Sequence, residues 1–319
     1  MFSKSGISCI SAGFLAAHAA KNPIPAAISI IIISSMSSII ITPVKHLLLA
    51  TPYEHFHITT KLIPAASCDF ASRFNKEGLM GRGMRFEQLN DGVWAMTYLL
   101  VDETTMEAAL VDPVYDYMDS YIQKLQQENL TLRYAIATHT HADHITACFN
   151  LRDVTGCEYV MWRDTASLGV SKYVEDLEQL MLGRHPITFH YAPGHTSDSM
   201  LIHFGNYLMT GDFLFTGEGG VGRDDLPSGR MRVHWGSLQV LNRFDGDLLV
   251  CTGHDPPGTE MKSLSWNREN NFVLNMTSFE EYQQWQDENN VKLGSVSKIK
   301  TAVPANLFCE IPDVIPWLD

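Results

Sequence analysis

The chain has 319 residues, of which 45% are hydrophobic and 18% charged, a composition typical of a folded globular protein rather than a disordered one. Its formal net charge of −13 argues against nucleic acid as a partner, because phosphate neutralisation needs a basic surface. The same charge argues against attachment to an acidic membrane surface through clusters of basic residues.

The first part of the chain differs in composition from the rest. Residues 1–83 contain 7 Lys and Arg but only 3 Asp and Glu, whereas residues 84–319 contain 16 and 33. The uncharged run Ala26–Thr42 is shorter than the about 20 apolar residues of a membrane-spanning helix and is interrupted by serines. A mitochondrial transit peptide would be rich in Arg, yet the first Arg is Arg73. We expect a largely unstructured leader over 1–83, either a targeting segment or an extension that is not part of the working protein, and a folded domain over 84–319.

Strands and helices are expected to alternate in the second part. The apolar runs Val93–Val101 and Ala108–Val111 flank a polar turn and predict a hairpin. Apolar residues spaced i, i+3, i+4 and i+7 over 118–125 predict an amphipathic helix, and Leu132–Ala137 predicts a buried strand. Further strands are expected at Tyr159–Trp162, Thr188–Tyr191, Met200–Phe204, Tyr207–Thr210 and Leu248–Cys251, and a helix at Val233–Phe244. This alternation favours an α/β sandwich, in which helices cover the sheets.

The six cysteines are scattered, with no CxxC pair and no repeated spacing. They predict neither a disulfide framework nor a structural zinc site. We therefore expect reduced thiols and a reducing compartment. That compartment is the cytoplasm, or the mitochondrial matrix if residues 1–83 are a transit segment.

The most informative segment is THTHADH, residues 138–144. His139 and His141 point the same way if they leave a strand, because side chains alternate with period two. Asp143 and His144 follow at the turn, where they can face the same point from another side. Nitrogen and oxygen donors at this density suit a divalent ion such as zinc or iron.

Three later residues repeat one pattern. His195, Asp212 and His254 each follow a predicted strand and a glycine, which permits a tight turn and close approach of the backbone. One such element is weak evidence for a site. Three of them, in this order after the histidine-rich segment, predict a metal site formed by loops at strand ends.

This order of motifs resembles the metallo-β-lactamase superfamily. The resemblance implies an αβ/βα four-layer sandwich as the fold of a catalytic domain, with metal at one edge of the sheets. Its hydrolases, glyoxalase II among them, usually hold two metals such as Zn²⁺, bridged by a water that acts as nucleophile. By that pattern the first metal would be held by His139, His141, His195 and Asp212, and the second by Asp143, His144, Asp212 and His254.

Finer motifs resemble the persulfide dioxygenase branch of this superfamily. THTHADHITA (138–147) is similar to that family's THxHADHITG, and GRDD (222–225) resembles its GRTDF. Near the end of the chain, AVPANLFC (302–309) resembles AVPANMRC. This last match is the most discriminating, because no requirement of metal binding dictates it.

The resemblance to this branch implies one Fe(II) per chain, bound by His139, His195 and Asp212. Two histidines and one carboxylate leave open positions for O₂ and a sulfur substrate. The implied reaction oxidises glutathione persulfide, or a related thiol-derived molecule, to sulfite and glutathione. Arg223 would bind the anionic substrate, with an ion pair to a neighbouring aspartate as the alternative. The remaining four donors would orient the ligands; these are His141, Asp143, His144 and His254.

The chain also departs from the branch's pattern. Asp224 replaces a Thr and would add negative charge beside the substrate, Leu226 replaces an aromatic residue, and Ala147 replaces a Gly. Gly217–Gly222 is unusually rich in glycine. Two alternatives to the dioxygenase stay open: a binuclear zinc hydrolase of the glyoxalase II type, and a non-catalytic metal-binding protein. The resemblance also implies a homodimer.

Overall fold

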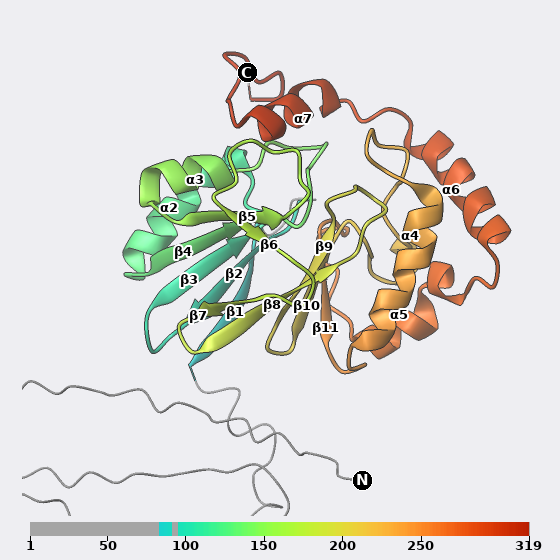
Figure 1. Ribbon diagram of the computed structural model, residues 1–319, viewed down its shortest axis with the longest axis horizontal. Coiled ribbons are helices and arrows are strands. Elements are labelled where there is room, and N and C mark those ends of the chain that lie inside the picture. Colours follow the sequence, from blue (N-terminus) through green and yellow to red (C-terminus); the bar gives the residue numbers. More distant parts are fainter. Residues whose placement is uncertain (1–82, 91–94, 319) are drawn as a thin grey trace, which may run out of the picture. The chain divides into compact units, whose positions relative to one another are not determined.

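The computed structural model describes residues 83–90 and 95–318. The predicted leader, apart from Gly83, lies outside these residues. Two sheets form the centre of the domain (Figure 1): one has six strands in the order β1-β2-β3-β4-β5-β6, and the other has five in the order β11-β10-β9-β8-β7. Among the described residues, none of the helices has the length and apolarity needed to cross a bilayer.

The first sheet contains β1 (Met84–Leu89), β2 (Thr97–Asp102), β3 (Glu107–Val111), β4 (Thr131–Ile136), β5 (Glu158–Trp162) and β6 (Lys172–Val174). The second contains β7 (Gln179–Leu182), β8 (His185–Tyr191), β9 (Met200–Phe204), β10 (Tyr207–Gly211) and β11 (Leu249–Thr252). The α-helices are α2 (Met118–Gln127), α3 (Cys148–Thr155), α4 (Met231–Ser237), α5 (Leu264–Asn270), α6 (Phe279–Leu293) and α7 (Ile299–Phe308). Short 3-10 helices are η2 (Tyr115–Tyr117), η3 (Gly217–Gly219), η4 (Leu238–Arg243) and η5 (Phe272–Asn275).

Three apolar clusters separate four layers of structure. One lies between the sheets and contains the inward side chains of both, such as Leu100 and Phe189. A second lies between the first sheet and helices α2 and α3, and a third between the second sheet and helices α4 to α6 (Figure 1). The order helix, sheet, sheet, helix confirms the predicted αβ/βα four-layer sandwich.

Most of the predicted elements are present. The predicted hairpin is β2 paired antiparallel with β3, although residues 93 and 94 lie outside the described part of the chain. The single helix predicted over 233–244 is wrong in detail: α4 ends at Ser237 and a 3-10 helix continues to Arg243. The four described cysteines are free thiols, as predicted; they are Cys148, Cys157, Cys251 and Cys309.

The glycine-rich stretch packs beneath aromatic side chains of the outer helices. Gly220 has a φ of +68°, and a Cβ built there would lie 3.0 Å from the ring of Trp285 on α6. A larger residue would therefore be strained by its backbone and by its neighbour. The stretch lets the loop after β10 pass close under α6.

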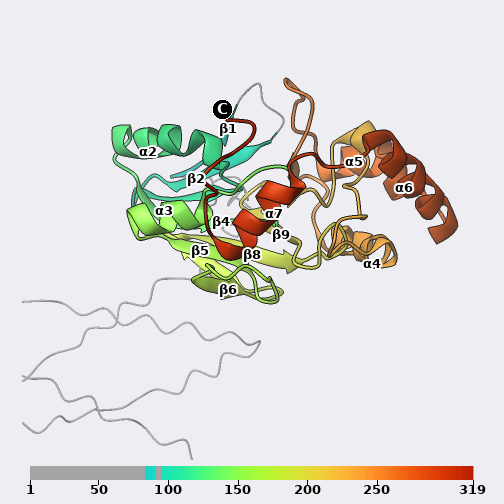
Figure 2. The same cartoon turned by 90° about the horizontal axis from the view of Figure 1, so that it is seen from above.

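Helix α7 lies apart from the other helices, over the edge of the sandwich where the strand ends meet (Figures 1 and 2). It ends at Phe308 and is capped by Cys309, whose backbone adopts the left-handed conformation. Its position brings the AVPAN motif to the loops described next.

Candidate metal centre

The predicted ligands lie at one edge of the sandwich because several strands end there. His139 follows the carboxyl end of β4 in the first sheet. His195 follows β8, and Asp212 follows β10, both in the second sheet. A backbone hydrogen bond joins the two sheets at this edge: the N–H of Met200 donates to the carbonyl of Thr138 at 3.0 Å, an ordinary length for such a bond.

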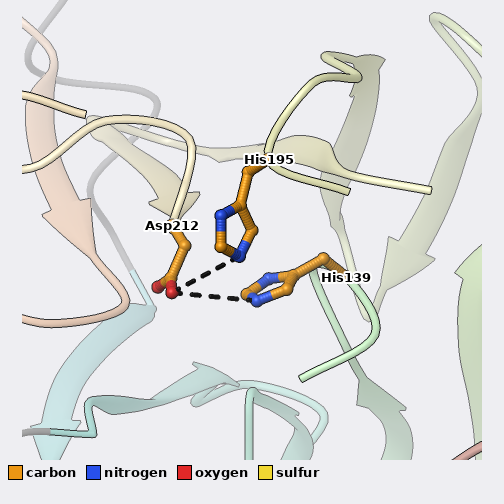
Figure 3. Close-up of side chains that lie close together, drawn as sticks. All are labelled: His139, His195 and Asp212. Carbon is orange, nitrogen blue, oxygen red and sulfur yellow. Dashed lines mark ion pairs between the residues drawn. The ribbon is translucent and has the colours of Figure 1, made fainter. Parts of the chain in front are cut away.

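The three side chains point toward one another (Figure 3). Nε2 of His195 lies 3.6 Å from Oδ2 of Asp212, and Nε2 of His139 lies 4.0 Å from the same oxygen. One donor atom from each residue lies within 4.8 Å of the other two. Because metal bonds to these donors are about 2 Å long, a single ion can reach all three atoms.

Hydrogen bonds orient both imidazoles with a lone pair toward this point. The hydroxyl of Thr138 donates to Oδ2 of Asp112 at 2.8 Å, so it accepts from Nδ1 of His139 at 2.9 Å. Nδ1 of His195 donates to the carbonyl of Arg223 at 2.6 Å. In each ring Nε2 is therefore the unprotonated nitrogen, the form that binds a metal.

Burial keeps the two rings neutral. The side chains of His139 and His195 are 2% and 3% exposed, and this burial holds the pKa of His139 well below its ordinary value and lowers the pKa of His195. Nε2 of His139 and Oδ1 of Asp212 are buried without a hydrogen-bond partner among the described residues. Buried donor atoms without a hydrogen-bond partner in both a histidine and the carboxylate beside it fit a bound metal ion, which would satisfy them.

A second group lies beside the first. Donor atoms of His141, Asp143 and His144 also lie within 4.8 Å of one another. His254 links the two groups, with Nε2 at 3.3 Å from Oδ2 of Asp143 and 3.6 Å from Oδ1 of Asp212. The structure thus brings all seven predicted donors to one region, in two clusters.

His141 lies beside the first cluster, with its ring centre 4.2 Å from that of His139. Its Nε2 contacts Oδ1 of the buried Asp112 at 3.1 Å. Burial alone lowers the pKa of His141, but the carboxylate of Asp112 outweighs this effect and raises the pKa above its ordinary value. Because only Nε2 contacts Asp112, Nδ1 of His141 stays buried without a hydrogen-bond partner among the described residues and is available as a metal ligand.

Comparisons with known proteins agree with this geometry. Residues 93–254 match the metallo-β-lactamase superfamily. Human mitochondrial persulfide dioxygenase ETHE1 is 32% identical over 219 residues, which cover 67% of this chain and 84% of the human protein. The crystal structure of ETHE1 from Myxococcus xanthus is 34% identical and has a TM-score of 0.66, covering 71% of this chain and 99% of that one.

The chain belongs to the metallo-β-lactamase superfamily, in its persulfide dioxygenase branch. It is an enzyme of this metal-dependent superfamily. A metallo-β-lactamase from Staphylococcus aureus, 21% identical with a TM-score of 0.62 over 71% of this chain and 72% of that one, shares the fold.

Sequence reasoning missed two buried aspartates that this superfamily member uses to hold its loops. Asp112, after β3, accepts from the backbone N–H and the hydroxyl of Thr138 and contacts His141. Asp198 accepts hydrogen bonds from the hydroxyls of Thr140, Thr165 and Thr196 at 2.6 to 2.7 Å. Their sequence signals are weak: Asp112 directly follows a strand, and Asp198 stands three residues after His195.

The AVPAN motif has a structural role at the same loop. Nδ2 of Asn306, on α7, donates to the carbonyls of His141 and His144, each at 3.0 Å. Its Oδ1 accepts from the backbone N–H of Thr146 at 2.9 Å. One buried side chain thus fixes both ends of the loop that carries Asp143. The motif is discriminating because it ties the end of the chain to the metal-binding segment.

A pocket of about 640 Å³ opens beside the cluster. Its wall includes His195, Asp212 and Arg223, the residue predicted to bind substrate. The Arg223 guanidinium also forms two hydrogen bonds to Asp225, at 2.6 and 2.7 Å, so the alternative ion pair is present as well.

Asp224 does not lie where the sequence suggested. Its side chain is buried, accepts a hydrogen bond from Tyr282 on α6 at 3.3 Å, and is not part of the pocket wall. The expected negative charge beside the substrate is therefore wrong. Leu226, in contrast, does line the pocket.

Proposed function

We propose that this enzyme is an Fe(II)-dependent persulfide dioxygenase that oxidises glutathione persulfide with O₂ and water to sulfite and glutathione. One persulfide, one O₂ and one water give one thiol, one sulfite and two protons, so atoms and electrons balance. The observation that carries the proposal is the meeting of His139, His195 and Asp212 at one buried point. The chain's membership of the persulfide dioxygenase branch supports the same activity.

In this proposal two histidines and one carboxylate hold the iron. Bound there, Fe(II) would supply open positions at which O₂ and a substrate sulfur meet. The chain's own residues do the rest of the positioning. Thr138 and the Arg223 carbonyl bind Nδ1 of His139 and His195, which would leave Nε2 of each imidazole free to hold the iron. The Arg223 guanidinium, which lines the pocket, is suited to bind a sulfur oxyanion through two parallel hydrogen bonds.

The second cluster favours one alternative, a binuclear zinc hydrolase of the glyoxalase II type. All seven donors of such a site are present, and His254 lies between the clusters. The contact of His141 with Asp112 is compatible with this alternative, because it engages Nε2 and leaves Nδ1 without a hydrogen-bond partner among the described residues. Against the alternative stands the similarity of the chain to persulfide dioxygenases. Two tightly bound Zn²⁺ per chain and hydrolysis of S-lactoylglutathione would favour this alternative.

The decisive experiment measures metal and oxygen together. Protein purified without chelator should contain about one iron per chain and should consume O₂ when glutathione persulfide is added. Asp212→Ala should lose the iron and at least about a hundredfold in kcat, because a ligand that holds the reactive centre is removed. Asp247→Ala, an exposed aspartate, is the control and should keep both. Two zinc ions with no O₂ uptake would reject the proposal.

The domain division and the location of the protein also remain proposals. We propose that residues 1–83 form a leader that precedes a catalytic domain over 84–319. Its human relative is named as mitochondrial, which is compatible with a transit segment; a cytoplasmic protein that starts near Met84 is the other possibility. N-terminal sequencing of the native protein distinguishes these. Sedimentation of the same material tests the proposed homodimer.

A further inference from the structure

The pocket has a wall formed by the segment between α6 and α7. Leu293, Ser295, Val296, Ser297 and Lys298 all line it. This segment faces the metal cluster across the same 640 Å³ space. A substrate whose sulfur reaches the metal would therefore extend its other end toward this segment.

Two described residues of the pocket wall carry a permanent positive charge, Arg223 and Lys298. The charge of Arg223 is compensated by Asp225, whose carboxylate it contacts through two nitrogens. Lys298 has no carboxylate partner within 4.0 Å among residues 83–90 and 95–318. Its ammonium lies 4.6 Å from the centre of the Trp317 ring. Trp317 does not line the pocket, but the ring leaves the charge of the ammonium in place, and the long lysine side chain can rotate from it toward an anion in the pocket.

Negative charge is concentrated at the other end of the pocket. Asp143, Asp212 and Asp255 line the wall around the metal cluster. An iron ion bound there would offset part of this negative charge. A carboxylate at the other end of the substrate would still be attracted by the ammonium of Lys298. The hydroxyls of Ser295 and Ser297, which line the same wall, can donate further hydrogen bonds.

We propose that Lys298 forms a carboxylate-binding subsite that selects persulfides carried by an acidic, peptide-like thiol over neutral thiols. This inference rests on the proposed function for the reaction itself, but it concerns only where the carrier binds. Lys298 is a specificity-determining residue here, not a ligand of the metal.

Binding can be measured without turnover, using S-methylglutathione as a stable thioether probe and its diethyl ester as a probe that lacks free carboxylates. Calorimetry should show that Lys298→Ala weakens binding of S-methylglutathione about five- to tenfold, the loss expected for one charge-assisted hydrogen bond at a partly exposed site. The diester should bind the wild type and Lys298→Ala within about twofold of each other. Lys298→Arg should restore most of the affinity.

Lys300, in the first turn of α7, provides a matched control. Lys300 lies two residues further on and lines a different surface depression, so Lys300→Ala should bind S-methylglutathione as the wild type does. Equal loss in the Lys298 and Lys300 variants, or equal loss for the acid and the diester, would overturn the proposal.

Steady-state oxygen uptake separates this inference from the proposed function. If both are correct, Lys298→Ala raises KM for glutathione persulfide about five- to tenfold and leaves kcat within about twofold. Absence of O₂ uptake by the wild type would reject the dioxygenase while the binding data still decide the role of Lys298. Normal uptake with an unchanged KM in Lys298→Ala would reject the subsite alone.

Discussion

Replacing Asn306 by leucine tests whether α7 holds the metal-binding loop in place. The change keeps the size of the side chain but removes three hydrogen bonds, two to the carbonyls of His141 and His144 and one from the N–H of Thr146. Asn306 is 2% exposed, so the three main-chain groups would be left unpaired and buried. Each such group costs about 1–3 kcal/mol. One loop carries all three main-chain groups and can relax. We therefore expect the free energy of unfolding to fall by about 3–5 kcal/mol, near the lower end of the sum of the three costs.

Urea unfolding followed by tryptophan fluorescence measures this loss, and elemental analysis of the same samples measures bound metal. Metal content should fall with stability, because the released loop carries Asp143 and follows His139 directly. Asn242→Leu is the control: Asn242 is exposed and bonds only the side chain of Gln239, so a change within about 0.5 kcal/mol is expected. A loss below about 1 kcal/mol in Asn306→Leu, with unchanged metal content, would refute the reasoning.

Two further predictions concern stability near α6. Burial raises the pKa of Asp224 from 3.8 to about 6, so the folded protein holds this proton more firmly, and stability is lost as pH rises between these values. Asp224→Asn, which mimics the protonated acid, should raise Tm at pH 8 and change it little at pH 4; a lower Tm at pH 8 would contradict this. Gly220→Ala, at φ +68° and 3.0 Å from Trp285, should cost about 1–3 kcal/mol in urea unfolding. Gly236 is exposed in α4, with nothing within 4 Å of an added methyl group, so Gly236→Ala should raise the free energy of unfolding by up to about 1 kcal/mol. Equal changes in the two variants would show that the conformation of Gly220 and its contact with Trp285 are unimportant for stability.

The central strands and the metal ligands could be predicted because their signals are local. A buried strand is an apolar run, and a ligand at its end follows within a few residues, as His139 follows β4. The short edge strands β6 and β7 were not predicted, since each has only three or four residues, of which one is buried. Helix α6 was missed for a related reason: only Tyr282 and Gln286 are buried along its length, which leaves almost no apolar periodicity.

Long-range contacts could not be predicted from these patterns. Asn306 stands in a motif that the sequence singled out, but its partners lie about 160 residues earlier in the chain. Asp224 was expected in the substrate site because it neighbours Arg223. The backbone turns the two side chains to different sides, one toward the pocket and the other toward Tyr282 on α6.

The origin of the three proposed ligands has a consequence for assembly of the fold. His139 follows a strand of the six-stranded sheet, whereas His195 and Asp212 follow strands of the five-stranded sheet. An ion bound by all three would cross-link the two halves of the sandwich at their shared edge. Such a site exists only after the two sheets have packed together. The free energy of metal binding would therefore add directly to the stability of their packing. Loss of the ion would accordingly destabilise the packing between the two sheets before it affected either sheet alone.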